Sequence, residues 1–449
     1  MKRAQCKLQS LVKRIQKGPQ LAIHLEEVLR GSLLAFSLKM LGGVLGFIFN
    51  VVLARLLGAE GAGIYYLALT VTTIASVIGR FGLDNALLRF VSASAAQQDW
   101  IKVAGLYRQG VLLASVTSLF VTTIVIIAAP WISQFIFSEQ GLITPLRIMA
   151  LGIIPLSLFN LHAEMLKGIR RIRAAIFLQS VLPVLFSLVL LFLLVAILEF
   201  GLVGGATSYS ASAISVLLLA FFSWRQATST IRRDKGWFSF QLLTATSIPL
   251  LWANLMNLAL GFTDTIMLGM LLNSDAVGVY NVALKTTMLS SFLLIAVYSV
   301  VGPKFASMWE QARLNELDDL AKTTTLLMAI IATAFFIVFV SMPGLILSLF
   351  GAEFLAGRAT LMVLAGGQFF VLATGPASHL LIMTGREKAY RNLVFLSAAL
   401  NALLNIALIP LLGILGAGIA TATSLATKNV LVGYYALTVI RTASRSHNV

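Results

Sequence analysis

Apolar windows of about 20 residues recur along this chain from one end to the other, and each is long enough to cross a bilayer as a helix. Charged residues make up 11% of the sequence, whereas a soluble protein of this length carries about a quarter. No polar stretch is long enough to fold as a separate soluble domain. The sequence therefore predicts an all-α integral membrane protein.

Twelve transmembrane helices are predicted, with connections that alternate between short and long. Their ranges are 32–57, 61–83, 106–130, 142–166, 174–198, 202–224, 247–272, 276–300, 321–343, 360–384, 391–412 and 416–439. Cys6 is the only cysteine, so an intrachain disulfide and a cysteine metal cluster are both excluded.

The distribution of Lys and Arg predicts the topology. Of the 33 Lys and Arg residues, 26 fall in the tails, loops and helix ends of one predicted side, and three fall on the other. Cations collect on the cytoplasmic side of a membrane protein, so we expect an even number of spans and both termini inside. The net charge of +16 then reflects membrane topology, and no nucleic-acid partner is predicted. The location predicted is the cytoplasmic membrane.

No signal peptide is predicted, because residues 1–20 lack a continuous apolar core and a small-residue cleavage site. Leu8, Leu11, Val12 and Ile15 share one helical face among basic residues, which predicts an amphipathic helix on the inner membrane surface. A flexible basic tail is the alternative interpretation.

The chain repeats itself at about half its length. FNVVLARLLGAEGAGIYYLAL begins at Phe49, and DTIMLGMLLNSDAVGVYNVAL begins at Asp264, an offset of 215 without a gap. Later, GLVGGA at 201–206 is matched by GILGAG at 413–418. Six helices in each half, both starting inside, predict a parallel two-fold pseudo-repeat about an axis along the membrane normal. The predicted parts are the N-terminal segment 1–31, lobes 32–224 and 247–440, the linker 225–246 and the tail 441–449.

Several motifs resemble one family of transporters. These are ARLLGAEGAGIY (54–65), GRFGLDNALLRFVS (79–92), FTDTIMLG (262–269), VGVYNVAL (277–284) and TGREK (384–388). In order and spacing they are similar to the polysaccharide (O-antigen type) flippases of the multidrug/oligosaccharidyl-lipid/polysaccharide exporter superfamily, which includes the MATE drug exporters. The resemblance implies a MATE-like fold. It also implies alternating-access transport of a lipid-linked glycan, carried on a polyprenyl pyrophosphate, from the inner to the outer leaflet.

Four cations lie within or at the end of predicted spans, namely Lys39, Arg80, Lys285 and Lys428. An ionisable residue within a span usually faces the interior of the bundle and has a function. We expect these four to line an inward cavity and to attract the pyrophosphate. The alternative is structural, with Lys39 extending to the interface and Arg80 capping a helix end.

Asp264 is the one acid deep within a predicted span, and antiparallel packing of 247–272 on 276–300 places it at a depth similar to that of Lys285. We expect the two to interact. Asp264 then either holds Lys285 until phosphate arrives or takes a coupling proton, and the coupling ion is a proton or sodium. A permanent structural salt bridge is the alternative.

Two other sets of residues are candidates for gates. Arg80, Asp84 and Arg89 cluster at the inner end of the second helix, either as a latch or as a solvated charge cluster. His162 and His379 match across the repeat at an offset of 217, as a symmetric gate or proton site or as ordinary interfacial histidines.

The sequence predicts a transporter and not an enzyme. It contains no DxD, HExxH, Cys/His cluster or P-loop, so we predict no catalytic residue, metal site or cofactor. Its partners are expected to be the bilayer, the lipid-linked glycan, and glycan synthesis or polymerisation proteins at the inner loops. A cation-coupled exporter of drugs or metabolites is the alternative function, and Asp264 is the residue that supports it.

Overall fold

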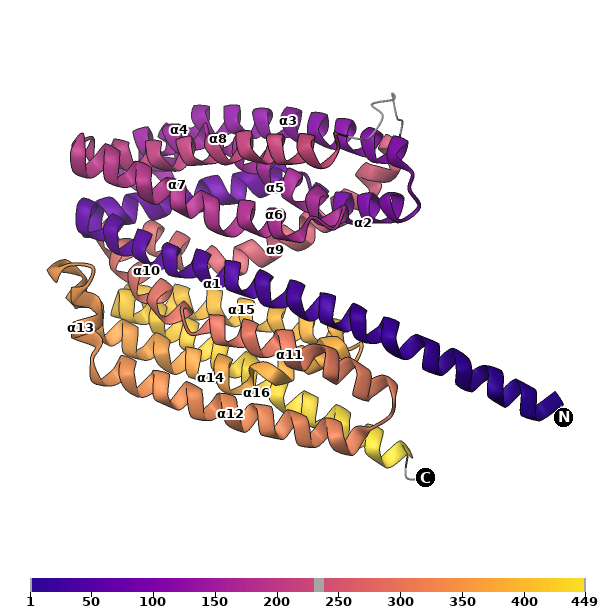
Figure 1. Ribbon diagram of the computed structural model, residues 1–449. Helices are drawn as coiled ribbons and strands as arrows, with labels where there is room; N and C mark the ends of the chain where they lie inside the picture. Colours follow the sequence, from indigo (N-terminus) through magenta and orange to yellow (C-terminus); the bar gives the residue numbers. More distant parts are fainter. Residues whose placement is uncertain (1, 230–237, 448–449) are drawn as a thin grey trace.

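The computed structural model describes the backbone of residues 2–229 and 238–447, and within these ranges it contains helices and turns but no strand (Figure 1). Side chains are described from Leu34 onward, apart from positions 257, 259, 260, 296, 299, 300, 303, 441 and 443–447. The predicted linker 225–246 and tail 441–449 lie partly outside the described residues, since 230–237 and 448–449 are not among them.

Within residues 2–229 the structure describes eight α-helices and four short π or 3-10 helices. These are α1 (Lys2–Gly79), α2 (Leu83–Ala96), α3 (Trp100–Trp131), η1 (Ile132–Ile136), η2 (Gln140–Leu142), α4 (Ile143–Ala150), α5 (Ile153–Gly168), α6 (Ile172–Ile176), η3 (Phe177–Val181), α7 (Leu182–Leu191), η4 (Phe192–Ile197) and α8 (Gly201–Ala227).

The second half is similarly helical. Its elements are α9 (Phe240–Leu271), α10 (Ser274–Met288), α11 (Ser291–Glu310), α12 (Leu314–Ser341), α13 (Pro343–Ser348), η5 (Ala352–Gly357), α14 (Arg358–Met383), α15 (Glu387–Leu412) and α16 (Ile414–His447).

Each of the twelve predicted spans falls, to within a few residues at its ends, in one of these helices or in a run of consecutive ones, so the predicted all-α membrane fold is confirmed. The first two spans share α1, which is divided at Gly58, where φ is 69° and ψ is −175°. With α1 counted once, eight described helices are long and apolar enough to cross a membrane, or ten if two bent pairs are included. The bends are 43° between the η2–α4 segment and α5, and 56° within α9.

The predicted boundary between segment 1–31 and the first span is not marked by a break in the helix, because α1 runs from Lys2 into that span. The membrane-surface location of this segment stays a prediction.

The helices form two lobes that share one end. Figure 1 shows α2–α8 on one side and α10–α16 on the other, with α1 and α9 between them, and α1 begins at the same end as α16 finishes. We call this the termini end and the other the opposite end. One buried core at the opposite end combines residues of both halves, such as Leu53, Leu142, Leu347 and Ile409. Of the other cores among the described residues, two lie within the second lobe, and one joins the first lobe to the start of α9 through Leu243. The lobes are therefore joined at the opposite end, whereas toward the termini end α10–α16 have cores separate from the one that the first lobe shares with the start of α9.

Candidate functional site

The two copies of the repeat meet each other at the opposite end. A Cβ added to Gly63 would lie 1.8 Å from the carbonyl oxygen of Ser274, and one added to Gly278 would lie 2.1 Å from that of Ala59. Gly63 and Gly278 are equivalent positions of the repeat, so the same short motif supplies both faces of this contact. Backbones can approach this closely only where no side chain intervenes.

Charged side chains reinforce the closed opposite end, and each contacts the other half of the chain. Glu353 accepts a hydrogen bond of 2.7 Å from the Ala59 N–H, directly after the kink at Gly58. Arg55 Nε donates one of 2.7 Å to the Leu349 carbonyl, just beyond α13. Carboxylates near helix N-termini and guanidinium groups near C-termini stabilise the unpaired backbone groups there.

A pocket of about 180 Å³ lies between the lobes, where α1 faces α10 and α11. Gly43, Gly46 and Asn50 line it from α1, and Lys285 and Phe292 line it from the other lobe. The Lys285 ammonium lies 5.3 Å from the centroid of the Tyr66 ring. Within the described part of the chain this ammonium has no carboxylate partner. A cation–π contact of this kind leaves the ammonium protons available to an anion.

Lys39 lies on the same stripe of α1 as the pocket. It precedes Gly43 by four residues and Gly46 by seven, spacings that place all three on one helix face. At 1.5 Å per residue it is about 6 Å nearer the termini end than Gly43. Its side chain is exposed. Lys39 therefore lies on the pocket side of α1, nearer the termini end, and its cavity role stays a prediction.

Filling the pocket is expected to block transport without disturbing the fold. No atom lies within 4 Å of a Cβ built on Gly46, so Gly46→Leu should be accommodated in the pocket space and reduce transport at least tenfold. Gly433→Leu is the matched control, because its nearest atom is 4.0 Å away on Thr374 and it does not line the pocket. Equal transport by the two variants, measured at equal amounts of folded protein, would rule out this pocket as the route.

Asp264 on α9 is buried, with 8% of its surface exposed, and is surrounded by neutral hydrogen-bond donors. Tyr280 and Thr421 donate to Oδ2 over 2.7 and 2.6 Å. Asn405 and Asn401 donate to Oδ1 over 2.6 and 3.1 Å. We call these five residues the Asp264 site. They come from α9, α10, α15 and α16, so the site lies within the second lobe.

The predicted interaction between Asp264 and Lys285 is wrong. No ion pair joins them, because both Asp264 oxygens accept from the second-lobe donors while Lys285 lines the pocket against α1. Tyr280 and Lys285 are five residues apart on α10, about 140° around the helix, so the two side chains point to different surroundings. The neutral donors were not predicted, although Asn401 and Asn405 stand four residues apart in an apolar helix.

One atom of the Asp264 site has no hydrogen-bond partner. Asn405 Oδ1 is buried and unpaired, while its amide nitrogen donates both to Asp264 and to Asn401. A buried acceptor without a donor is costly, and a cation or a water is its usual partner. The site therefore offers a carboxylate and several neutral oxygens close together.

The first copy of the repeat lacks this carboxylate. Phe49 stands at the position equivalent to Asp264, and its ring packs against that of Tyr65, the equivalent of Tyr280, with centroids 6.0 Å apart. The Asp264 site is thus confined to one of the two duplicated positions.

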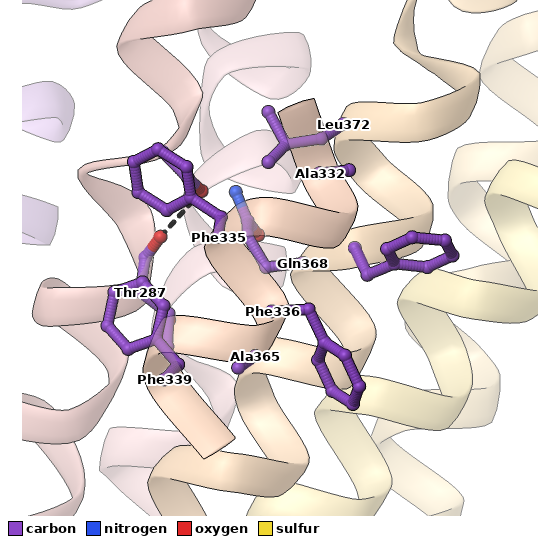
Figure 2. Close-up of a pocket in the computed structure, with 10 residues that line it drawn as sticks. Thr287, Ala332, Phe335, Phe336, Phe339, Ala365, Gln368 and Leu372 are labelled. Atoms are coloured by element: carbon purple, nitrogen blue, oxygen red, sulfur yellow. Dashed lines mark hydrogen bonds between the residues drawn. The ribbon is translucent and has the colours of Figure 1, made fainter. Parts of the chain in front are cut away.

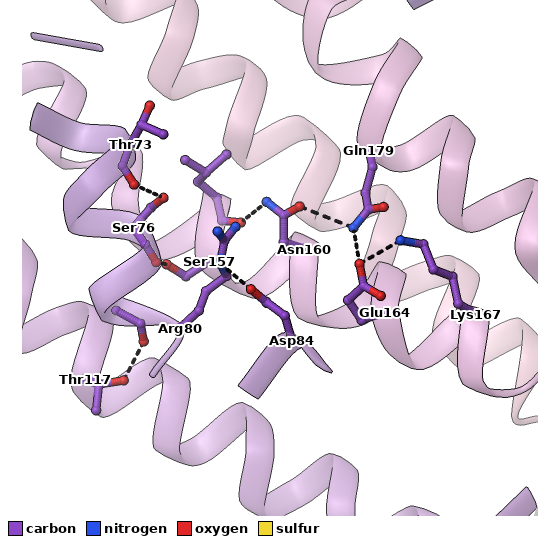
Figure 3. Close-up of polar contacts among 12 residues, drawn as sticks. Thr73, Ser76, Arg80, Asp84, Thr117, Ser157, Asn160, Glu164, Lys167 and Gln179 are labelled. Atoms are coloured by element: carbon purple, nitrogen blue, oxygen red, sulfur yellow. Dashed lines mark hydrogen bonds and ion pairs between the residues drawn. The ribbon is translucent and has the colours of Figure 1, made fainter. Parts of the chain in front are cut away.

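Arg80 is neutralised within its own lobe. Its Nε lies 3.0 Å from Asp84 Oδ2, and both side chains are about 15% exposed (Figure 3). Glu164 forms a neighbouring pair with Lys167 at 2.7 Å and accepts from Gln179 at 3.0 Å. Arg80 therefore has a carboxylate partner that Lys285 lacks. Its assignment to the cavity stays a prediction.

The remaining candidates are separated from one another. Arg89 is exposed, with its guanidinium 5.8 Å from the Phe90 ring centroid and, among the described residues, no ion pair with Asp84. Lys428 lies on α16, seven residues after Thr421, partly exposed and without a described ion pair. The proposed latch role of Arg89 and cavity role of Lys428 are not tested by these contacts.

The two histidines each pack inside their own lobe. His162 Nδ1 lies 2.7 Å from the Leu158 carbonyl, and its Nε2 lies 3.3 Å from the Tyr107 hydroxyl. His379 stacks on Tyr298 with ring centroids 4.6 Å apart. Neither ring has a described contact with the opposite lobe, and their gate role stays a prediction.

A second pocket lies inside the second lobe, between α10, α12 and α14 (Figure 2). Phe335, Phe336 and Phe339 line it from α12, and Gln368, which lines it from α14, donates to Ser291 over 2.6 Å. Its free volume is about 10 Å³, barely enough for one water. Across the described residues, no group of three or more His, Cys, Asp or Glu side chains is placed to hold a metal ion.

Comparison with known proteins places this arrangement in a family. Residues 28–309 match the family model "Polysaccharide biosynthesis protein", and residues 249–411 match the MatE model. The chain is similar to the probable low-salt glycan biosynthesis flippase Agl15 of Haloferax volcanii, with 24% identity over 91% of this chain and 83% of the relative.

Solved structures share the fold. An inward-facing MATE multidrug resistance transporter has a TM-score of 0.73 at 15% identity, covering 92% of this chain and 99% of the other. The lipid II flippase MurJ in an inward closed conformation has a TM-score of 0.70 at 14% identity, covering 89% and 87%. The protein therefore belongs to the polysaccharide biosynthesis protein family, within the MATE-like exporter superfamily.

Proposed function

We propose that this protein moves a polyprenyl-pyrophosphate-linked oligosaccharide from the inner to the outer leaflet of the cytoplasmic membrane by alternating access. Both termini are then cytoplasmic, as the distribution of Lys and Arg predicts. The family and the similarity to a probable glycan flippase support a lipid-linked glycan as the cargo.

The observation that carries the proposal is the unpaired ammonium of Lys285 in the pocket between the lobes. A cation removed from water without a counter-ion is costly, and an anionic ligand removes that cost. The pyrophosphate is the anionic part of such a substrate, and it would be drawn to Lys285 with Lys39 nearer the entrance. Asn50 lines the same pocket, and its amide nitrogen, which donates one hydrogen to the Gly46 carbonyl, has a second for phosphate or sugar oxygens.

The division of the buried cores supports a direction of entry. The lobes share a core at the opposite end, whereas toward the termini end α10–α16 have cores separate from the one that the first lobe shares with the start of α9. With the termini in the cytoplasm, the pocket is reached from the inner side, which is the loading state of an inner-to-outer flippase.

We assign the coupling ion, sodium or a proton, to the Asp264 site. Hard cations prefer oxygen ligands, and this site combines a carboxylate with the hydroxyl of Thr421 and the amides of Asn401 and Asn405. Rotation of either amide would turn a carbonyl oxygen toward the ion. A proton would bind Asp264 directly.

A sided assay of lipid-linked sugars in cells without the protein tests the function. The complete glycan–lipid should accumulate on the inner leaflet of deletion cells and return to the outer leaflet when the wild-type gene is restored. A normal glycan–lipid distribution together with altered export of organic cations would instead establish the second candidate, a cation-coupled exporter. The buried carboxylate of Asp264 and the similarity to a MATE transporter favour that candidate.

Asp264→Asn is expected to abolish the dependence of transport on a cation gradient. The amide keeps the size of the carboxylate but can neither hold a proton nor neutralise sodium. Flipping in proteoliposomes should lose its response to sodium and pH gradients, falling to the rate without a gradient. Asp318→Asn is the control, since that carboxylate pairs with Lys322 at the surface. An unchanged gradient response of Asp264→Asn would remove Asp264 from coupling.

A further inference from the structure

The short helix α10 contacts four separate parts of the transport machinery. Ser274 at its first turn donates to Glu139 of the other lobe over 2.7 Å. Gly278 packs its backbone against Ala59 of the other lobe. Tyr280 donates to Asp264, and Lys285 lines the pocket. Ser274 and Lys285 are eleven residues apart, about 16 Å along one helix. Because all four contacts lie on one helix, a displacement of α10 at any one of them displaces the others.

Tyr280 connects the Asp264 site to this helix through a single hydroxyl. The hydroxyl donates to Asp264 Oδ2 over 2.7 Å and lies 3.0 Å from Thr421 Oγ1. The side chain is fully buried, and its ring belongs to the core shared by both lobes. Close packing around the ring leaves it little room to move alone, so a displacement of the hydroxyl moves the helix backbone as well.

Cation binding changes what the Tyr280 hydroxyl can do. While Asp264 is unoccupied, the carboxylate oxygen accepts the Tyr280 proton. A cation on that oxygen takes over the same lone pairs, and the hydroxyl then donates to Thr421 in place of Asp264. Tyr280 is the titratable group in direct contact with Asp264, and within the described residues no charged side chain forms an ion pair with that carboxylate.

The closed end tolerates almost no movement of α10. Gly278 stands two residues before Tyr280, and the position its Cβ would take lies 2.1 Å from the Ala59 carbonyl. Close-packed contacts of this kind respond to shifts of a few tenths of an ångström. The equivalent helix of the first lobe has no described hydrogen bond from its tyrosine to a carboxylate, because Tyr65 faces Phe49.

We propose that Tyr280 is the positioning residue through which cation occupancy of the Asp264 site loosens the contact between α10 and α1 at the opposite end. The cation favours opening of that end, and its release allows Gly278 and Gly63 to close again. This inference rests on the proposed coupling role of Asp264. It assigns the coupling between the Asp264 site and α10 to the Tyr280 hydroxyl. Tyr65, the equivalent residue of the first lobe, is expected to have no such role.

Spin labels across the opposite end test the proposal in the full-length protein. With Cys6 replaced by serine, cysteines at the exposed positions Glu60 and Ala352 carry the labels, and pulsed EPR measures their separation. In the otherwise wild-type protein, sodium at constant pH or acidification at constant ionic strength should lengthen the separation. The treatment that lengthens the separation, sodium addition or acidification, identifies the coupling ion. In Tyr280→Phe that ion should produce less than a fifth of the shift.

Binding of the ion is measured beside the distances, by 22Na binding or by proton uptake on acidification. Tyr280→Phe should still bind the ion, while Asp264→Asn should not. Tyr65→Phe is the matched control and should keep the full shift. A full shift in Tyr280→Phe would overturn the inference and leave the proposed function intact. Loss of ion binding in Tyr280→Phe would also overturn it, because the hydroxyl would then be a ligand only. Wild-type protein that binds no ion would remove the coupling role of Asp264 as well, while the sided glycan–lipid assay would still decide the cargo.

Discussion

Lys285→Ala is expected to reduce flipping of the lipid-linked glycan by ten- to a hundredfold, while Lys285→Arg keeps most of it. The Lys285 ammonium lines the pocket between the lobes and has an aromatic ring beside it in place of a carboxylate. Hydrogen bonds to charged groups contribute about 1.5–3 kcal/mol, and each 1.4 kcal/mol corresponds to a factor of ten. Alanine removes the proposed interaction with the pyrophosphate, whereas arginine retains the charge and adds donors.

The measurement is the rate of appearance of glycan–lipid in the outer leaflet, in proteoliposomes containing equal amounts of folded protein. Lys322→Ala is the control, because that cation is exposed and pairs with Asp318 outside the pocket. The expected pattern is a loss for Lys285→Ala alone, with substrate affinity falling more than the maximal rate. Unchanged flipping by Lys285→Ala would mean that the anionic part of the cargo binds elsewhere.

Gly278→Val is expected to stop the opposite end from closing and to abolish transport. The first carbon of the new side chain would lie 2.1 Å from the Ala59 oxygen and 3.0 Å from its carbonyl carbon, and both are backbone atoms that cannot rotate away. The lobes must therefore separate at this end. Because alternating access needs each end to close in turn, a protein held open at one end completes no cycle.

The position of the lobes is measured by the reaction of a cysteine at Glu60 with a membrane-impermeant reagent added from outside. Labelling should be severalfold faster in Gly278→Val than in the parent. Gly366→Val serves as the control, because the nearest atom to its added Cβ is 3.7 Å away, on Phe336, and it lies within the second lobe. A Gly278→Val protein that labels slowly and transports normally would show that this glycine contact is not needed for closure.

The amino-acid sequence was sufficient for the fold class, because spans in a bilayer must be long, apolar and internally hydrogen-bonded. It was also sufficient for the two-fold repeat, and the repeated motif proved to be the contact surface of the closed end. Gly63 and Gly278 were visible as equivalent positions in the sequence. Their mutual packing at that end follows from symmetry, since equivalent points of two lobes meet at the axis that relates them.

The pairing of charges was decided by the tertiary structure alone. Depth along two helices predicted that Asp264 and Lys285 would meet, yet depth says nothing about rotation around the helix axis. The Asp264 carboxylate accepts hydrogen bonds from residues of α15 and α16, more than 130 positions away, whereas Lys285 faces α1. The sequence by itself determined which segments form helices long and apolar enough to cross a membrane, because hydropathy and helical rise are local properties. Only the packing of the helices decided which of those residues touch, because direction around a helix is set by neighbours far away in the chain.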